Sequence, residues 1–318
     1  MQCSGPTDAG AGAGEVASRI IRSMVLTDDD LVRLQTTANR IRQDVIKMLV
    51  AAGSGHSAGP LGMADVFTTL YFQVLRHDPR RPDWPERDRL VLSNGHICPV
   101  LYATLAEAGY FPVAELATLR QLGSRLQGHP HREKLPGLET SSGPLGSGLS
   151  QAAGMALVAK RDGLRWRTYC LMSDGEHEEG NTWEAVMFAA KYRLHNLCAI
   201  LDRNNIQIDG FTEEVMPLEP LKAKYEAFNW HVLEIDGHNY EQIVAACEEA
   251  RAIFEKPTLI IAHTIPGKGV DFMENRFEWH GSPPDAANVA GAPPKGQQAA
   301  VALAELRTLQ GRIRSEHE

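Results

Sequence analysis

Short apolar runs alternate with longer segments of helical spacing along most of this chain. Five runs have the length of strands and are bounded by polar or glycine residues: 89–92, 168–172, 197–201, 231–235 and 258–262. Segments of helical spacing lie between most of them, notably 149–160, 183–192 and 240–254. Strands that alternate with helices form a parallel sheet covered on both faces. We therefore predict an α/β fold with a doubly wound, mainly parallel sheet, and ligands bound beyond the carboxyl ends of the strands.

The remaining segments predict helices at 28–52, 63–75 and 297–309. Residues 1–14 are rich in Gly and Ala, and we expect them to form a mobile leader. The sequence has no internal repeat, so we expect residues 15–318 to form one domain.

Charge and hydropathy argue against several classes of protein. The 318-residue chain has a formal net charge of −8 and no dense run of Lys or Arg, so we expect no nucleic-acid partner. No apolar run approaches the roughly 20 residues of a membrane-spanning helix, and residues 1–14 lack the apolar stretch of a signal peptide. We expect a cytoplasmic protein without a membrane partner, whose five scattered cysteines are mostly buried free thiols.

Histidine and glycine occur side by side more often than chance predicts. Five of the twelve histidines adjoin a glycine, namely His56, His96, His129, His238 and His280. Glycine permits the sharp loop conformations that bring a chain close to a ligand. An imidazole can both accept and donate a proton near neutral pH. We infer that several of these histidines are displayed in one cleft.

Polar residues follow two of the predicted strands directly. Asp174-Gly175 comes after the run 168–172, and Asn204 comes after 197–201. Neighbouring parallel strands would place both at the same edge of the sheet, where a carboxylate, an amide oxygen and the Ile206 carbonyl suit Mg²⁺ or Ca²⁺. Gly175 would let the main chain approach a diphosphate, with a following helix directing its amides at that anion. On these residues alone, ordinary turns are an equal alternative.

The joint order of the motifs resembles the N-terminal half of transketolases. The similarity runs through nearly the whole chain: SGHSAGPLGMADV from Ser54, DRLVLSNGH ending at His96, QGHP around His129, LPGLETSSGPLGSGLSQAAGMA from Leu135, SDGEHEEGNTWEA from Ser173, LDRNNIQIDG from Leu201 and TIPGKGVDFMENRFEWHG ending at Gly281. Two departures are Ser173, where the family usually has glycine, and one added residue between His129 and Leu135.

This resemblance implies the thiamine-diphosphate-binding fold of the diphosphate type, with thiamine diphosphate and Mg²⁺ as cofactors and Ca²⁺ or Mn²⁺ as substitutes. It makes Asp174, Asn204 and the Ile206 carbonyl the metal ligands. Gly175, His96 and His280 would approach the diphosphate, and Gly143, Leu145 and Ile208 would flank the cofactor rings. The substrate channel would be lined by His56, His96, His129 and His280. Glu179 matches an acidic residue that pairs with a carboxylate across a subunit interface.

The implied reaction transfers a two-carbon ketol unit from a ketose, often phosphorylated, to an aldose. Full transketolases continue into a pyrimidine-binding domain, whose glutamate helps to activate the cofactor, and then into a C-terminal domain. This sequence resembles neither. We therefore expect the partner to be a separate C-terminal transketolase subunit, most simply in an α2β2 assembly, and we expect no activity without it.

Three alternatives remain. The α subunit of a 2-oxo acid dehydrogenase also carries an Asp…Asn metal motif, but it is not expected to carry the histidine series found here. A deoxyxylulose-phosphate synthase normally keeps both catalytic domains on one chain. A non-catalytic paralogue is disfavoured because Asp174, Asn204 and the channel histidines are intact.

Overall fold

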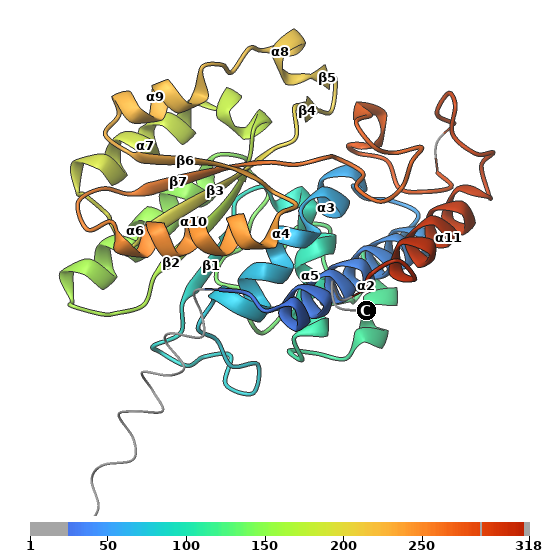
Figure 1. Ribbon diagram of the computed structural model, residues 1–318, viewed down its shortest axis with the longest axis horizontal. Coiled ribbons are helices and arrows are strands. Elements are labelled where there is room, and N and C mark those ends of the chain that lie inside the picture. Colours follow the sequence, from blue (N-terminus) through green and yellow to red (C-terminus); the bar gives the residue numbers. More distant parts are fainter. Residues whose placement is uncertain (1–24, 287, 315–318) are drawn as a thin grey trace, which may run out of the picture.

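The computed structural model describes residues 25–286 and 288–314, so the predicted leader at 1–14 lies outside the described residues. A five-stranded sheet lies at the centre (Figure 1). Its strands are β1 (Arg89–Leu92), β2 (Thr168–Ser173), β3 (Leu197–Arg203), β6 (His231–Asp236) and β7 (Thr258–His263). They run in the order β1-β2-β3-β7-β6 and every pair is parallel. The predicted fold class is confirmed, and all five predicted strands are present.

Helices cover both faces of the sheet because both faces of its strands are apolar. Along β3, Cys198 and Ile200 pack into one core, and Leu197, Ala199 and Leu201 pack into the other. The first core lies against α2 (Asp28–Ala52), α4 (Ala64–Thr69), α5 (Cys98–Glu107) and α10 (Tyr240–Ala252). The second lies against α6 (Ser147–Arg161), α7 (Gly180–Lys191) and α9 (Leu221–Ala227).

The long helix α2 has the start and stop signals that its sequence carries. Thr27 accepts a hydrogen bond from the Asp30 amide, and the Asp30 carboxylate accepts one from the Thr27 amide in return, which forms a capping box. The helix stops at Gly53, whose φ of 60° is left-handed. Alongside α2 lies α11 (Gln298–Gln310), where the Leu306 carbonyl accepts a bond of 2.8 Å from the Asn39 side chain (Figure 1).

Several short elements lie near the carboxyl ends of the strands. They are α3 (Ala58–Gly62), the 3₁₀ turns η2 (Gly95–Ile97), η4 (Gly175–Glu178) and η5 (Phe277–Trp279), the hairpin of β4 (Ile206–Gln207) and β5 (Gly210–Phe211), and α8 (Thr212–Val215). A further 3₁₀ segment, η3, spans Val113–Thr118. The helix predicted at 63–75 is divided, because α4 is followed by the π-helical turn η1 (Leu70–Val74).

Two other expectations from the sequence, on the cysteines and on membrane-spanning helices, can be compared with the described residues. The four cysteines in the described ranges, Cys98, Cys170, Cys198 and Cys247, are buried free thiols, as predicted. Among the described helices, none is long and apolar enough to span a membrane.

Two glycines of α6 allow a direct test of how tightly this helix packs against the sheet. A Cβ at Gly148 would lie 2.4 Å from Ser93 Cβ, whereas a Cβ at Gly154 would have no atom within 4 Å. We expect Gly148→Ala to lower the free energy of unfolding by about 1–3 kcal/mol through overpacking. Gly154→Ala, the matched control, should raise it by about 0.5–1 kcal/mol through helix propensity. Urea unfolding of both variants measures the difference, and equal effects would contradict the close approach of α6 to β1.

Candidate functional site

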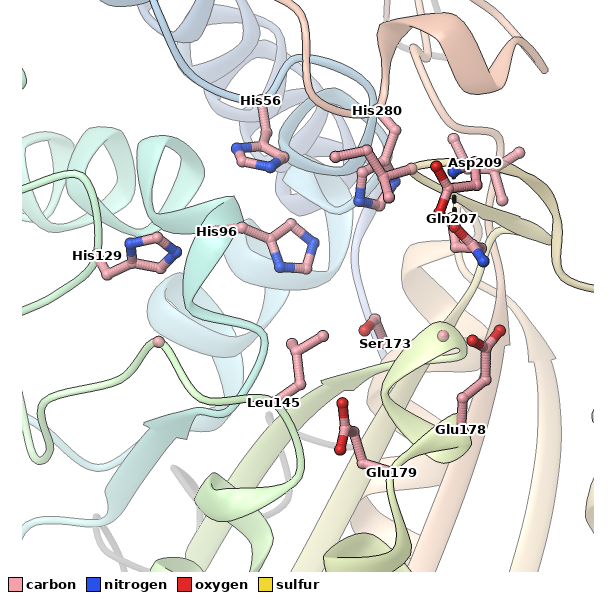
Figure 2. Close-up of a pocket in the computed structure, with 14 residues that line it drawn as sticks. His56, His96, His129, Leu145, Ser173, Glu178, Glu179, Gln207, Asp209 and His280 are labelled. Atoms are coloured by element: carbon pink, nitrogen blue, oxygen red, sulfur yellow. Dashed lines mark hydrogen bonds between the residues drawn. The ribbon is translucent and has the colours of Figure 1, made fainter. Parts of the chain in front are cut away.

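A cavity of ≈ 510 Å³ opens at the carboxyl ends of β1, β2 and β3 (Figure 2). A cavity of this size suits a ligand as large as a typical cofactor. Ten of the twelve residues that the resemblance assigns to the site line it: His56, His96, His129, Gly143, Leu145, Gly175, Glu179, Ile206, Ile208 and His280. The other two, Asp174 and Asn204, lie buried beside it in the chain segments that supply Gly175 and Ile206. The structure therefore brings these twelve residues together, whereas His238, the fifth glycine-adjacent histidine, bonds to Asp65 and does not line the cavity.

Three imidazoles from distant parts of the chain form a group in this cavity (Figure 2). His56 follows the end of α2, His96 lies in η2 after β1, and His280 follows η5. The ring centroids are 4.9 Å apart for His56 and His96, 5.1 Å for His96 and His280, and 5.6 Å for His56 and His280. His129 lies to the side of this group, and its ring is 3.8 Å from where a Cβ on Gly143 would be.

The surroundings of these histidines favour the neutral imidazole. Burial lowers the pKa of His56 to about 3, with further lowering by His280 and Arg120, and burial lowers the pKa of His280 to about 4. Burial likewise holds the pKa of His96 well below its usual range and lowers that of His129. At neutral pH each ring can therefore donate one hydrogen bond and accept another.

Asp174 and Asn204 follow adjacent strands, because β2 and β3 pair with Ser173 opposite Asp202. The Asp174 carboxylate accepts hydrogen bonds from the Gly175 amide at 2.8 Å and from the Asn205 amide at 2.6 Å. The Asn204 amide oxygen accepts from the Ile206 amide at 3.1 Å, and its nitrogen donates to Asp202 at 2.8 Å. These contacts fix the orientation of both side chains.

The buried carboxylates here are held in a medium that disfavours their charge. Burial raises the pKa of Asp174 to about 6, although Arg203 and the Asn205 amide oppose the rise. Burial and the nearby Asp174 raise the pKa of Asp202 to about 7. A hard divalent cation beside Asp174 would stabilise the ionised form. Within the described ranges, no three His, Cys, Asp or Glu side chains form a metal cluster, so other ligands would have to come from amide, carbonyl or cofactor oxygens.

Glu176 is a residue whose importance the sequence did not indicate. It is fully buried and accepts hydrogen bonds from the Ser93 hydroxyl, from the Gly146 amide, and from the Ser173 amide at 3.3 Å. Burial raises its pKa to about 7. Glu176 therefore joins the end of β1, the glycine turn before α6 and the end of β2. Three glutamates lie within four residues here, and no local pattern distinguishes the buried one from the other two.

Two histidines that line the cavity, and Asn94 at the start of the turn that carries His96, have side-chain polar atoms without a partner among the described residues. Both side-chain atoms of buried Asn94 make no hydrogen bond, and neither do the Nδ1 atoms of His56 and His280. Buried polar groups without partners are costly, so such groups beside a cavity indicate a polar ligand. Together with the main chain of Gly175, which lines the cavity, they fit a cofactor that has a polar ring and an anionic end.

Glu178, Gln207 and Asp209 complete the rim and were not predicted (Figure 2). Gln207 accepts a hydrogen bond of 2.6 Å from the Asp209 amide, which shapes the hairpin turn. Glu179 occupies the N-cap position of α7, and its exposed side chain reaches the cavity without capping the helix.

Fold and site together define an α/β protein with a cofactor-sized cavity at the carboxyl edge of a parallel sheet. The family described as "Transketolase, thiamine diphosphate binding domain" matches residues 34–295. The chain belongs to this family.

Two relatives are of similar length. The chain is 46% identical to the 6-deoxy-6-sulfo-D-fructose transketolase subunit SqwG of a Clostridium species, over 78% of this chain and 90% of that protein. It is 43% identical to an apulose-4-phosphate transketolase subunit from Phocaeicola vulgatus, over 81% of this chain and 90% of that protein.

Among solved structures, transketolase from Leishmania mexicana superposes with a TM-score of 0.76 and 32% identity, covering 88% of this chain and 46% of that one. The chain thus spans about half the length of that solved transketolase.

The low pKa of His280 predicts how a variant changes the acid stability of the chain. The unfolded chain protonates His280 as the pH falls below about 6.5, whereas the folded chain keeps it neutral down to about 4. His280 therefore destabilises the fold progressively as the pH falls through this window. At pH 5, His280→Asn should be more stable relative to wild type than at pH 7.5, by on the order of 1–2 kcal/mol. Urea unfolding at both pH values tests this, and a pH-independent difference would mean that the imidazole is not held neutral.

Proposed function

We propose that this chain is the thiamine-diphosphate-binding subunit of a split transketolase, which transfers a two-carbon ketol unit from a ketose to an aldose. The observation that carries the proposal is the cavity in which the histidine group, the glycine turn and the Asp174–Asn204 edge meet. Relatives of matching length that are named as transketolase subunits support it. We also propose that residues 15–318 act as one domain in the cytoplasm.

We propose that the cofactor spans the cavity from the strand ends to the histidines. Gly175 lines the cavity beside Asp174 and has no side chain, so its main chain would lie against the diphosphate, together with His96 and His280. Gly143, Leu145 and Ile208, which line the cavity, would hold the rings. When bound, thiamine diphosphate supplies the electron sink for cleavage of a carbon–carbon bond.

The metal ligands from this chain would be Asp174, Asn204 and the Ile206 carbonyl, with Mg²⁺ as the natural ion and Ca²⁺ or Mn²⁺ as substitutes. Asp174 and Asn204 are buried and oriented by main-chain amides. Such pre-orientation lowers the cost of ordering ligands around a small cation.

His56, His96, His129 and His280 would contact the sugar. Their neutral rings can donate and accept hydrogen bonds with vicinal hydroxyls, and can move a proton at a hydroxyl while the neighbouring carbon–carbon bond breaks or forms. Burial also removes water from around the reacting carbon. The relatives are named for a sulfonated and a phosphorylated sugar, so we propose an anionic ketose as donor.

A partner subunit, most simply in an α2β2 assembly, is supported by apolar side chains that are exposed on α7 and around the β4–β5 hairpin. On α7, Met187 is 52% exposed and precedes Phe188, whose ring centroid lies 4.7 Å from that of exposed Tyr192. Around the hairpin, Ile208 is 62% and Met216 is 56% exposed. Exposed apolar side chains grouped in this way are typical of protein interfaces. Glu179, directly before α7, is exposed at the cavity rim, which suits a contact with the partner.

Asp174→Asn should weaken Mg²⁺-dependent binding of thiamine diphosphate to the assembled enzyme by about a hundredfold or more, because an amide lacks the charge that holds a hard cation. The substitution preserves shape, so the fold should survive. Asp209→Asn removes a carboxylate at the same cavity that does not contact Asp174, and it should leave the affinity within about threefold. Titration calorimetry at fixed Mg²⁺ measures both, and an unchanged affinity in Asp174→Asn would refute the metal assignment.

The purified chain alone should have no ketol-transfer activity with ketose donor, aldose acceptor, Mg²⁺ and thiamine diphosphate. Addition of a complementary subunit with a pyrimidine-binding domain should restore turnover, because that domain would supply the glutamate that activates the cofactor. Robust turnover by the partner-free chain would overturn the split-enzyme proposal.

Glu179→Gln should raise the partner concentration needed for half-maximal activity.

A further inference from the structure

A buried arginine contacts one candidate metal ligand and directly precedes the other in the sequence. Arg203 is the last residue of β3, lies directly before Asn204 and is 3% exposed. Its Nη1 atom donates to Asp174 Oδ2 at 3.2 Å and to Thr212 Oγ1 at 2.9 Å. An always-charged group thus contacts the carboxylate to which we assign the metal, and it does so from the interior of the protein.

The other side of the Arg203 guanidinium contacts the far end of the loop that follows β3. Nη2 donates to Glu213 at 2.9 Å and to Glu219 at 3.0 Å. Both carboxylates are themselves fixed by main-chain amides, Glu213 by that of Leu218 at 3.1 Å and Glu219 by that of Leu221 at 2.8 Å. Arg203 therefore joins β3 to both the start of α8 and the segment that leads into α9.

This loop contains the hairpin that forms one wall of the cavity. At the base of the hairpin, the Asn205 amide donates to Asp174 Oδ2 at 2.6 Å, and the Thr212 amide donates to the Asn205 carbonyl at 3.0 Å. At its turn, Ile208 and Asp209 line the cavity. Asp174 is thus bonded to both sides of the hairpin base, directly through Asn205 and by way of Arg203 through Thr212.

We propose that Arg203 is a positioning residue that locks the Asp174 carboxylate and the hairpin Asn205–Thr212 into one unit. The metal part of this inference rests on the proposed function, but the positioning part does not. Binding of a divalent cation to Asp174 is then coupled to the position of the cavity wall at Ile208. Neither the Asp174 carboxylate nor the hairpin can move without breaking the same hydrogen bonds.

Geometry as well as charge suits an arginine to this position. The side chains of Glu213 and Glu219 are 41% and 52% exposed, so solvent screens their ion pairs and they add little stability. A planar guanidinium offers five donors in fixed directions and reaches four acceptor residues here. An ammonium on a flexible stem has three donors from one atom and cannot span them.

Hydrogen exchange on the full-length, ligand-free chain tests the positioning role. We expect Arg203→Met to speed amide exchange in the segment 205–212 by about tenfold or more, and Arg203→Lys to give an intermediate increase and keep the test informative if the Met variant folds poorly. Arg251→Met is the matched control, because that partly buried arginine donates to Val74 on the α10 side of the sheet. It should leave exchange in the segment unchanged. Exchange unchanged in both Arg203 variants would overturn the proposal.

A second experiment tests the coupling. Mg²⁺ is titrated at a fixed concentration of thiamine diphosphate, and amide exchange in the segment 205–212 is measured at each Mg²⁺ concentration. In wild type the segment should become protected as Mg²⁺ is added, and Arg203→Lys should raise the midpoint by about tenfold. Cofactor binding without protection of the segment, or an unchanged or lower midpoint in Arg203→Lys, would overturn the coupling. Failure of wild type to bind the cofactor in the presence of its partner would instead contradict the proposed function, and the ligand-free exchange would still decide the role of Arg203.

Discussion

The parallel pairing of β2 with β3 is the constraint on which the site depends. Its register sets Ser173 opposite Asp202, so that Asp174 and Asn204 leave the sheet side by side. The surroundings are dry enough to raise the pKa of both Asp174 and Asp202. Buried acids of this kind persist only where donors or cations compensate them. Main-chain amides and Arg203 provide part of that compensation, and the proposed Mg²⁺ would provide more.

The rest of the cavity follows from what neighbouring segments add around this edge. Glu176 fastens the glycine turn to the ends of β1 and β2, which places Leu145 opposite the histidine group. Burial is the main cause that lowers the pKa of His56 and His280, and Arg120 lowers that of His56 further, so the cavity has an uncharged region at the histidines and acidic side chains at the strand ends. That polarity suits a long ligand whose anionic end is bound through a cation and whose reactive end faces hydrogen-bonding rings.

The regular part of this fold could be predicted well from the sequence, and the reason is physical. Strands buried on both faces are continuous apolar runs, so 197–201 and 258–262 were recognisable without any partner. The turn η1 and the two-residue strands of the β4–β5 hairpin are too short to show a period. Asp174, Asn204 and the histidines stood out because they lie at strand ends or next to glycine, whereas Leu145, Ile208 and Glu179 were assigned only through the resemblance to transketolases. Glu176 and Arg203 were missed because burial of a charged side chain depends on tertiary contacts that no local pattern encodes.

Anomalous diffraction from a crystal grown with Mn²⁺ and thiamine diphosphate tests the central claim most directly, because it locates the metal without relying on activity. The account predicts one strong manganese peak within coordination distance of Asp174, Asn204 and the Ile206 carbonyl, with the diphosphate bridging from it towards Gly175. A diphosphate bound without contact to Gly175, or a manganese peak away from the ends of β2 and β3, would contradict the account.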